Sequence, residues 1–267
     1  MWTIMAAALF IATVGAHEAG HWLAFREAGI PVTQVGIGLP LPPRLILWRR
    51  GGAHEAGASP WRRARRGGVE VVLSPWLLGA YVTPAATPGQ IDELPFRKLA
   101  WCAGAGVVVN LVAGAAFGAV CEAMRGDWLR TAVLSALAAV IWTARRFLPA
   151  VFPFLGIGIM VLLAVGLATE ARNGQSGGIT GTAAALVSHS AAGAVAIAAL
   201  MSVAMAMLNM IPLHPLDSGR IMRAIIRSRL GQRAADRYGA FSTITCLVLV
   251  VVLPLLTDIL HLLHWRL

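Results

Sequence analysis

Charged residues are scarce in this chain of 267 residues: only 13% are Asp, Glu, Lys or Arg, whereas 58% are hydrophobic. A soluble globular chain has about 25% charged and about 45–50% apolar residues. The shortage of charge therefore excludes a disordered protein and argues against a soluble one. A membrane-spanning helix needs about 20 apolar residues. Apolar stretches of about this length therefore define the organisation of the chain.

Cysteine is also scarce. The three cysteines, Cys102, Cys121 and Cys246, lie far apart in apolar runs, and no CxxC pair occurs. This spacing excludes a disulfide framework and a cysteine-rich zinc site. We expect the three side chains to be small buried hydrophobes. The sequence also has no internal repeat and no soluble module.

Six apolar stretches predict an all-α polytopic membrane protein with about six transmembrane helices. The first begins at Met1 without a basic region and is too long for the core of a signal peptide, so we expect a retained span. The third and fourth form either a tight hairpin of two spans or in-plane helices, and Pro149 and Pro153 favour a break between them. The stretches cover residues 2–25, 99–121, 130–148, 150–169, 184–211 and 240–264.

Acidic residues are fewer than basic ones, 12 against 22, and the basic residues are unevenly placed. With six spans, three loops on one side carry 18 of the 22. The positive-inside rule places this side in the cytoplasm and both termini outside. We therefore attribute the positive charge to orientation in a lipid bilayer and expect no nucleic-acid partner. The composition is compatible with a bacterial inner membrane.

The first of these loops, residues 26–98, has three parts. Residues 31–48 and 69–83 carry β-branched and aromatic residues with Pro and Gly breaks. They predict a small membrane-associated β-hairpin or sheet. Residues 49–68 are mostly Gly, Ala and Arg, which predicts a flexible cytoplasmic loop. In a later loop, residues 217–237 alternate apolar residues with arginines and predict an amphipathic helix on the cytoplasmic surface.

The first span contains His17-Glu18-Ala19-Gly20-His21, an HExxH motif. Residues i and i+4 of a helix lie on one face, so both imidazoles can reach one Zn²⁺ ion. Glu18 then remains available as a general base. Three ionisable groups inside an apolar segment are costly, which favours function over a chance polar cluster.

Two histidines leave a catalytic zinc one protein ligand short. Asp217 follows the end of the fifth span. This end lies on the same membrane face as the end of the first span, which carries HExxH. The other acidic residues near span ends lie toward the opposite face. Topology therefore favours Asp217 as the third ligand. His214 is the competing ligand, because Pro212 and Pro215 leave the side-chain directions open.

These motifs resemble those of the site-2 protease family of intramembrane zinc metalloproteases. HEAGH at 17–21 matches the family's HExxH. NMIPLHPLDSG at 209–219 is similar to NxxPxxxLDG, with Asp217 at the third-ligand position and Ser218 where glycine is usual.

Two shorter motifs support the resemblance. AGVVVN at 105–110 looks like AGPxxN with Val107 in place of proline, and it ends at Asn110. LGAYV at 78–82 is similar to the GGYV that follows the family's membrane-embedded β-hairpin.

The resemblance implies one metalloprotease domain over residues 1–267, with core spans at 2–25, 99–121 and 184–211. Many members of the family carry PDZ domains and others a C-terminal CBS domain, but we expect neither here, and residues 122–183 are too apolar for a PDZ domain. The extra hairpin at 130–169 would stand between the core helices. The implied substrates are single-span membrane proteins such as anti-sigma factors, membrane-tethered transcription factors or signal-peptide remnants.

The implied site holds one zinc ion on His17, His21 and Asp217, with Glu18 as catalytic base. Asn110 is implied to lie near the site and to bind substrate, although a simple interhelical hydrogen bond is its alternative. Two other functions use the same residues, a catalytically silent membrane scaffold or chaperone and a metal transporter. The intact Glu18 and ligand positions argue against the scaffold, and the lack of repeat symmetry argues against the transporter.

Overall fold

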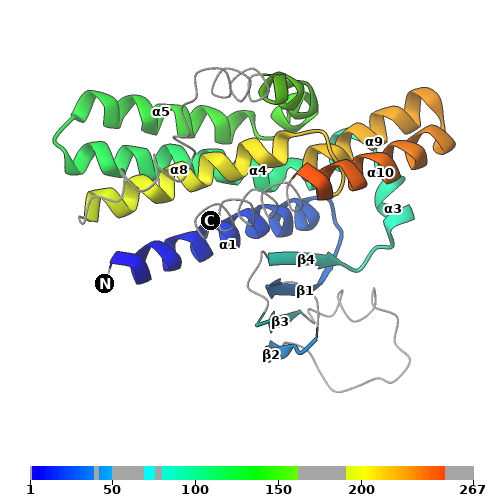
Figure 1. Cartoon of the computed structure of the whole chain (residues 1–267), viewed down its shortest axis with the longest axis horizontal. Coiled ribbons are helices and arrows are strands. Elements are labelled where there is room, and N and C mark those ends of the chain that lie inside the picture. The colour runs from blue at the N-terminus through cyan, green and yellow to red at the C-terminus, as the bar shows by residue number, and fades with distance from the viewer. Residues whose placement is uncertain (1, 39–41, 50–68, 76–79, 162–190, 250–267) are drawn as a thin grey trace, which may run out of the picture.

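The computed structural model describes residues 2–38, 42–49, 69–75, 80–161 and 191–249. These residues form a helical bundle with a small sheet at its side (Figure 1). The strands are β1 (Val32–Ile37), β2 (Leu45–Arg49), β3 (Glu70–Leu73) and β4 (Ala80–Pro84). The helices are α1 (Trp2–Glu27), α3 (Pro88–Asp92), α4 (Phe96–Met124), α5 (Trp128–Ala144), the 3-10 turn η1 (Leu148–Val151), α8 (Ala191–Met210), α9 (Asp217–Leu230) and α10 (Gln232–Leu247).

Helix α4 is the centre of the bundle and packs against α1, α5 and α8. Small residues make these contacts close, as is usual between helices in membranes. A Cβ atom on Gly20 of α1 would lie 2.7 Å from the Ala105 carbonyl oxygen, and one on Gly114 would lie 2.7 Å from Val203 of α8. Glycine at these two positions thus brings the three core helices to the separation at which their polar residues can meet.

The helices agree in part with the predicted spans. Within the described part of the chain, α4 and α8 are each long and apolar enough to cross a membrane. Helix α4 covers the predicted span 99–121; α1 covers residues 2–25 as a helix, and its role as a span stays a prediction. The predicted break after α5 is present, and the helical segment 148–161 runs at 89° to α5. Residues 162–190 and 250–267 lie outside the described ranges, so the count of six spans stays a prediction.

The basic turn after α5 lies beside the end of α1. The Glu27 carboxylate accepts a hydrogen bond from Trp101 Nε1 at 3.1 Å and pairs with Arg146 at 3.3 Å and Arg145 at 4.0 Å. The end of α1, the first turns of α4 and the α5–η1 turn therefore meet at one end of the bundle. This arrangement agrees with the predicted topology, in which the loops that follow α1 and α5 share one side.

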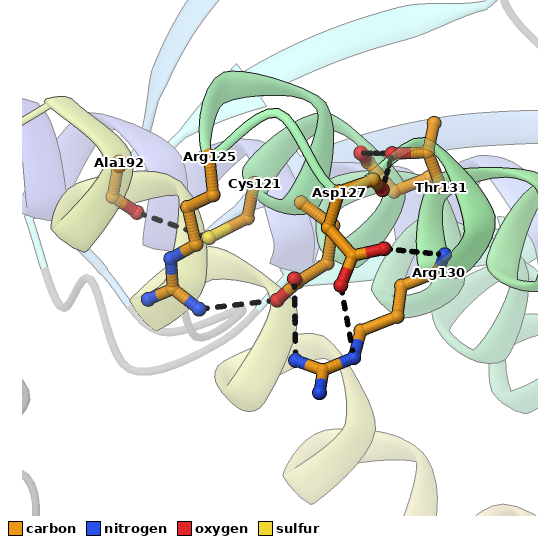
Figure 2. Close-up of polar contacts among 8 residues, drawn as sticks. Cys121, Arg125, Asp127, Arg130, Thr131 and Ala192 are labelled. Carbon is orange, nitrogen blue, oxygen red and sulfur yellow. Dashed lines mark hydrogen bonds and ion pairs between the residues drawn. The ribbon is translucent and has the colours of Figure 1, made fainter.

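The opposite turn, between α4 and α5, is organised by exposed ion pairs (Figure 2). Asp127 accepts a hydrogen bond from the backbone N–H of Arg130 at 3.0 Å and so caps α5. Glu122 pairs with Arg125 at 3.0 Å and with Arg130 at 3.7 Å. Gly126, with φ of +81°, supplies the left-handed residue that ends α4 and reverses the chain.

The first loop forms a four-stranded sheet in the order β2-β3-β1-β4. Strand β1 pairs in parallel with β3 and antiparallel with β4. The sequence predicted either a β-hairpin or a sheet, and the structure has the sheet. Val32 shares a buried cluster with Phe25 of α1, and Val35 and Val82 pack against that cluster, so the sheet lies against the helix that carries HExxH. The predicted flexible loop lies mostly in residues 50–68, outside the described ranges.

The prediction of one amphipathic helix over residues 217–237 is wrong. The helix stops at Gly231, whose φ of +84° is readily adopted only by glycine. Helix α10 then begins at Gln232, eight residues before the predicted last span. Arg223 of α9 and Asp236 of α10 pair at 2.8 Å and join the two helices side by side.

Candidate metal centre

The HExxH motif places two imidazoles on one buried face of α1. His17 and His21 are 6% and 7% exposed, and their Nε2 atoms are 3.2 Å apart. The i, i+4 spacing of the two residues produces this arrangement directly. Two imidazole nitrogens that meet in a buried site, away from water, need a common hydrogen-bonding or metal partner.

Asp217, the first residue of α9, completes the cluster. Its Oδ2 lies 3.3 Å from Nε2 of His17 and 3.3 Å from Nε2 of His21. Zinc bonds of about 2.0–2.1 Å in tetrahedral geometry would place ligand atoms about 3.3 Å apart, which matches all three separations. Oδ2 is buried and has no hydrogen-bond partner within the described residues. The donor set and its spacing thus fit a zinc ion.

Helix α4 orients both imidazoles through their second nitrogens. His21 Nδ1 lies 2.8 Å from the carbonyl oxygen of Cys102, to which it can only donate, so Nε2 keeps its lone pair for a metal. His17 Nδ1 lies 3.0 Å from the side-chain amide of the fully buried Asn110. The Oδ1 atom of Asn110 has no partner among the described residues. An amide turned by 180° would offer Oδ1 to a protonated Nδ1 and leave Nε2 of His17 free for a metal.

Gly106 is a residue of this site that the sequence reasoning missed. A Cβ atom there would lie 2.5 Å from Nε2 of His17 and 2.6 Å from Nε2 of His21. Cys102, Gly106 and Asn110 are spaced by four, so all three lie on the face of α4 that packs against the motif. That spacing was the signal in the sequence that could have identified the glycine.

Glu18 lies beside the cluster without belonging to the three-residue set that could hold a metal. Its carboxyl is partly buried and interacts electrostatically with both histidines, with Asp217 and with Arg220. A carboxylate near the metal position but outside the ligand set is a candidate general base.

His214, the competing ligand, points to a different element. Its Nδ1 lies 3.0 Å from Thr243 Oγ1 on α10. Burial, with the positive charges of Arg220 and Arg223, lowers the pKa of His214, so its imidazole is neutral near pH 7. The side-chain amide of Asn209 donates to the Met205 carbonyl at 3.1 Å, one turn earlier in the same helix. The structure therefore brings Asp217, and not His214, to the two histidines.

The family model of peptidase family M50 matches residues 5–253, which is nearly the whole chain. No individual curated protein matches the chain. The match includes the HExxH helix, the α4 face that orients it and the loop that ends at Asp217. This protein belongs to peptidase family M50, the site-2 protease family of membrane metallopeptidases.

Proposed function

We propose that the protein is an intramembrane zinc endopeptidase that hydrolyses peptide bonds in or near the transmembrane segments of membrane proteins. The observation that carries the proposal is the triangle of His17, His21 and Asp217 atoms, 3.2–3.3 Å apart, beside Glu18. Three protein ligands leave a fourth position for water, as catalytic zinc sites do and closed structural sites do not. A silent scaffold has no need for that arrangement.

The chain's own residues account for the proton transfers. Bound zinc supplies Lewis-acid activation of a water molecule and of the scissile carbonyl. Glu18 takes the proton of the attacking water and then delivers it to the leaving amine. Asn110 and the Cys102 carbonyl keep the two imidazoles oriented throughout, because they contact the nitrogens that face away from the metal position.

A substrate helix must unwind before its amides can be cleaved, because each is hydrogen-bonded within the helix. Strand β4 is an edge of the sheet and the strand next to α1 (Figure 1). We propose that its outer edge pairs with the unwound substrate by strand addition. The proposed substrates are single-span membrane proteins such as anti-sigma factors or signal-peptide remnants.

The proposed setting is a bacterial inner membrane with both termini outside and the site near the cytoplasmic face. The contacts of Glu27 with Arg145 and Arg146 support this topology, because they gather the basic turn at the end of α1 that follows the motif. A cysteine-accessibility map tests it, and an external location for residue 60 would overturn it.

The experiment that tests the function measures zinc and cleavage in the same preparations. We expect about one zinc per chain in the detergent-purified wild type and in Glu18→Gln, and little in Asp217→Ala. Cleavage of co-reconstituted tagged anti-sigma factors and signal-peptide remnants should fall at least about 100-fold in Glu18→Gln, because a general base contributes about 10²–10⁴-fold. Turnover retained in Glu18→Gln would refute the assigned base.

The two alternatives give different results in the same vesicles. If the protein is a scaffold, both the wild type and Glu18→Gln would bind substrate without cleaving it. A transporter would move zinc across the vesicle membrane at the same rate in the wild type and in Glu18→Gln.

A further inference from the structure

Helix α10 is in contact with the segment that carries the third metal ligand. We name residues 211–216, between α8 and α9, the ligand loop, since Asp217 follows it directly. Three hydroxyl side chains of α10 bond to this loop. They are Tyr238 and Ser242, which are four residues apart and lie on one face of the helix, and Thr243, which is adjacent to Ser242.

The bonds reach two residues of the loop. The Tyr238 hydroxyl donates to the Pro212 carbonyl oxygen. The backbone N–H of His214 donates to Ser242 Oγ at 3.3 Å, and the His214 imidazole meets Thr243 Oγ1 at 3.0 Å. Ser242 is only 1% exposed, so its bond is shielded from water. Helix α10 thus contacts both the backbone of the loop and the side chain of His214.

Besides the bonds from α10, the backbone of the ligand loop is tied to its neighbours only at its two ends within the described residues, where the Ile211 N–H donates to the Leu208 carbonyl of α8 and the Leu216 carbonyl accepts from the Arg220 N–H of α9. Pro212 and Pro215 have no N–H to donate. Within the described residues, the backbone N–H groups of Leu213 and Leu216 donate only to carbonyls of the loop itself. Asp217 opens α9 after Leu216, which provides no side-chain cap. The local sequence therefore leaves the direction of Asp217 undetermined.

Helix α9 also depends on the position of the loop. A Cβ atom on Gly219 would lie 2.3–2.4 Å from backbone atoms of Leu213 and His214, so the first turn of α9 lies directly against the loop. A displacement of the loop would shift this turn and Asp217 with it. Oδ2 of Asp217 would then leave its position 3.3 Å from the two Nε2 atoms.

We infer that Tyr238 and Ser242 are positioning residues for the third metal ligand, which act on Asp217 through the ligand loop. The inference rests on the zinc site of the proposed function. It assigns to α10, which supplies no ligand, the role of an outer support. Groups that bond directly to metal ligands affect metal affinity about 10–100-fold when they are removed, and this range sets the scale for a support that acts through the loop.

The test measures the zinc dissociation constant by chelator competition in the full-length, detergent-purified protein. We expect Tyr238→Phe combined with Ser242→Ala to raise this constant about 10–100-fold, with a smaller rise for Tyr238→Phe alone. Tyr238→Phe removes a single oxygen, so it keeps the test valid if the double variant does not fold.

The chain offers matched controls. Tyr81→Phe removes the only other tyrosine hydroxyl, which bonds to Gln34 at 3.2 Å in the sheet. Ser228→Ala removes a hydroxyl that bonds to the Ile225 carbonyl of its own helix. Neither bond involves the ligand loop, so both variants should keep the wild-type zinc affinity. A rise of equal size in these controls would overturn the inference, because it would show a general loss of packing.

A double-mutant cycle separates positioning from a structural role. In an Asp217→Ala background, the α10 substitutions should leave the remaining zinc affinity unchanged, because the group through which they act is gone. The same fold-change with and without Asp217, or unchanged affinity in the α10 variants, would refute the inference while the zinc site stands. A wild type that binds no zinc would instead refute the proposed function, and the inference with it.

Discussion

Two polar clusters lie along α4, and they differ in burial more than in chemistry. The outer one joins Glu122, Arg125, Asp127 and Arg130 at 3.0–3.7 Å at the α4–α5 turn (Figure 2). Its arginine side chains are 55% and 71% exposed. Exposed pairs of this kind contribute about 0–1 kcal/mol, so this cluster serves to end one helix and begin the next.

The inner cluster makes fewer ion-pair contacts but is excluded from solvent. His17, His21 and Asp217 are each less than 10% exposed, and Asn110 is fully buried. Ionisable groups are costly in such a place unless they are paired or bind a metal, and inside a membrane protein they indicate function. The comparison shows that burial, and not the number of charged contacts, distinguishes a site from a turn.

The largest effect should follow from filling the space between the inner cluster and α4. We expect Gly106→Ala to reduce zinc from about one per chain to near none, because the new methyl carbon would lie 2.5–2.6 Å from both ligand nitrogens. Metal analysis of the purified protein measures this. Gly15→Ala on α1 is the control, since a Cβ atom there meets nothing within 4 Å. Normal zinc content in Gly106→Ala would contradict the geometry of the site.

A smaller effect should follow from changing the partner of His17. Asn110→Leu should raise the zinc dissociation constant about 10–100-fold, because His17 loses the group that orients its ring. Asn110→Asp should stay close to the wild type, since a carboxylate accepts a hydrogen bond from Nδ1 as the amide oxygen would. Chelator competition measures both constants. Equal losses in the two variants would show that the amide N–H₂, and not its oxygen, is the required group.

The smallest effect should follow from breaking the outer cluster. Glu122→Gln and Arg130→Gln remove ion pairs at 3.0–3.7 Å with exposed arginines. Each should change the free energy of unfolding by at most about 1 kcal/mol and leave zinc binding and cleavage unchanged. Denaturant unfolding in detergent gives the first quantity. A loss of zinc in either variant would mean that the two clusters are coupled along α4.

The meeting of His17, His21 and Asp217 could be predicted because its constraints are local or topological. HExxH needs only the helical repeat to bring His17 and His21 together. Asp217 needed the side of the membrane on which its span ends. The sequence favoured Asp217 over His214 by topology but left the side-chain directions open. The structure places Asp217 Oδ2 3.3 Å from both Nε2 atoms and His214 against Thr243, 29 residues away along the chain.

The sequence by itself determined the apolar helices, the two-histidine face with Glu18 beside it, and a small sheet after the first helix. These features follow from periodicity and spacing within one segment. Tertiary structure decided the parallel pairing of β1 with β3, the closeness of Gly106 to the imidazoles and the support of the ligand loop by α10. Each of these depends on two segments that are distant in sequence and meet only when the bundle packs.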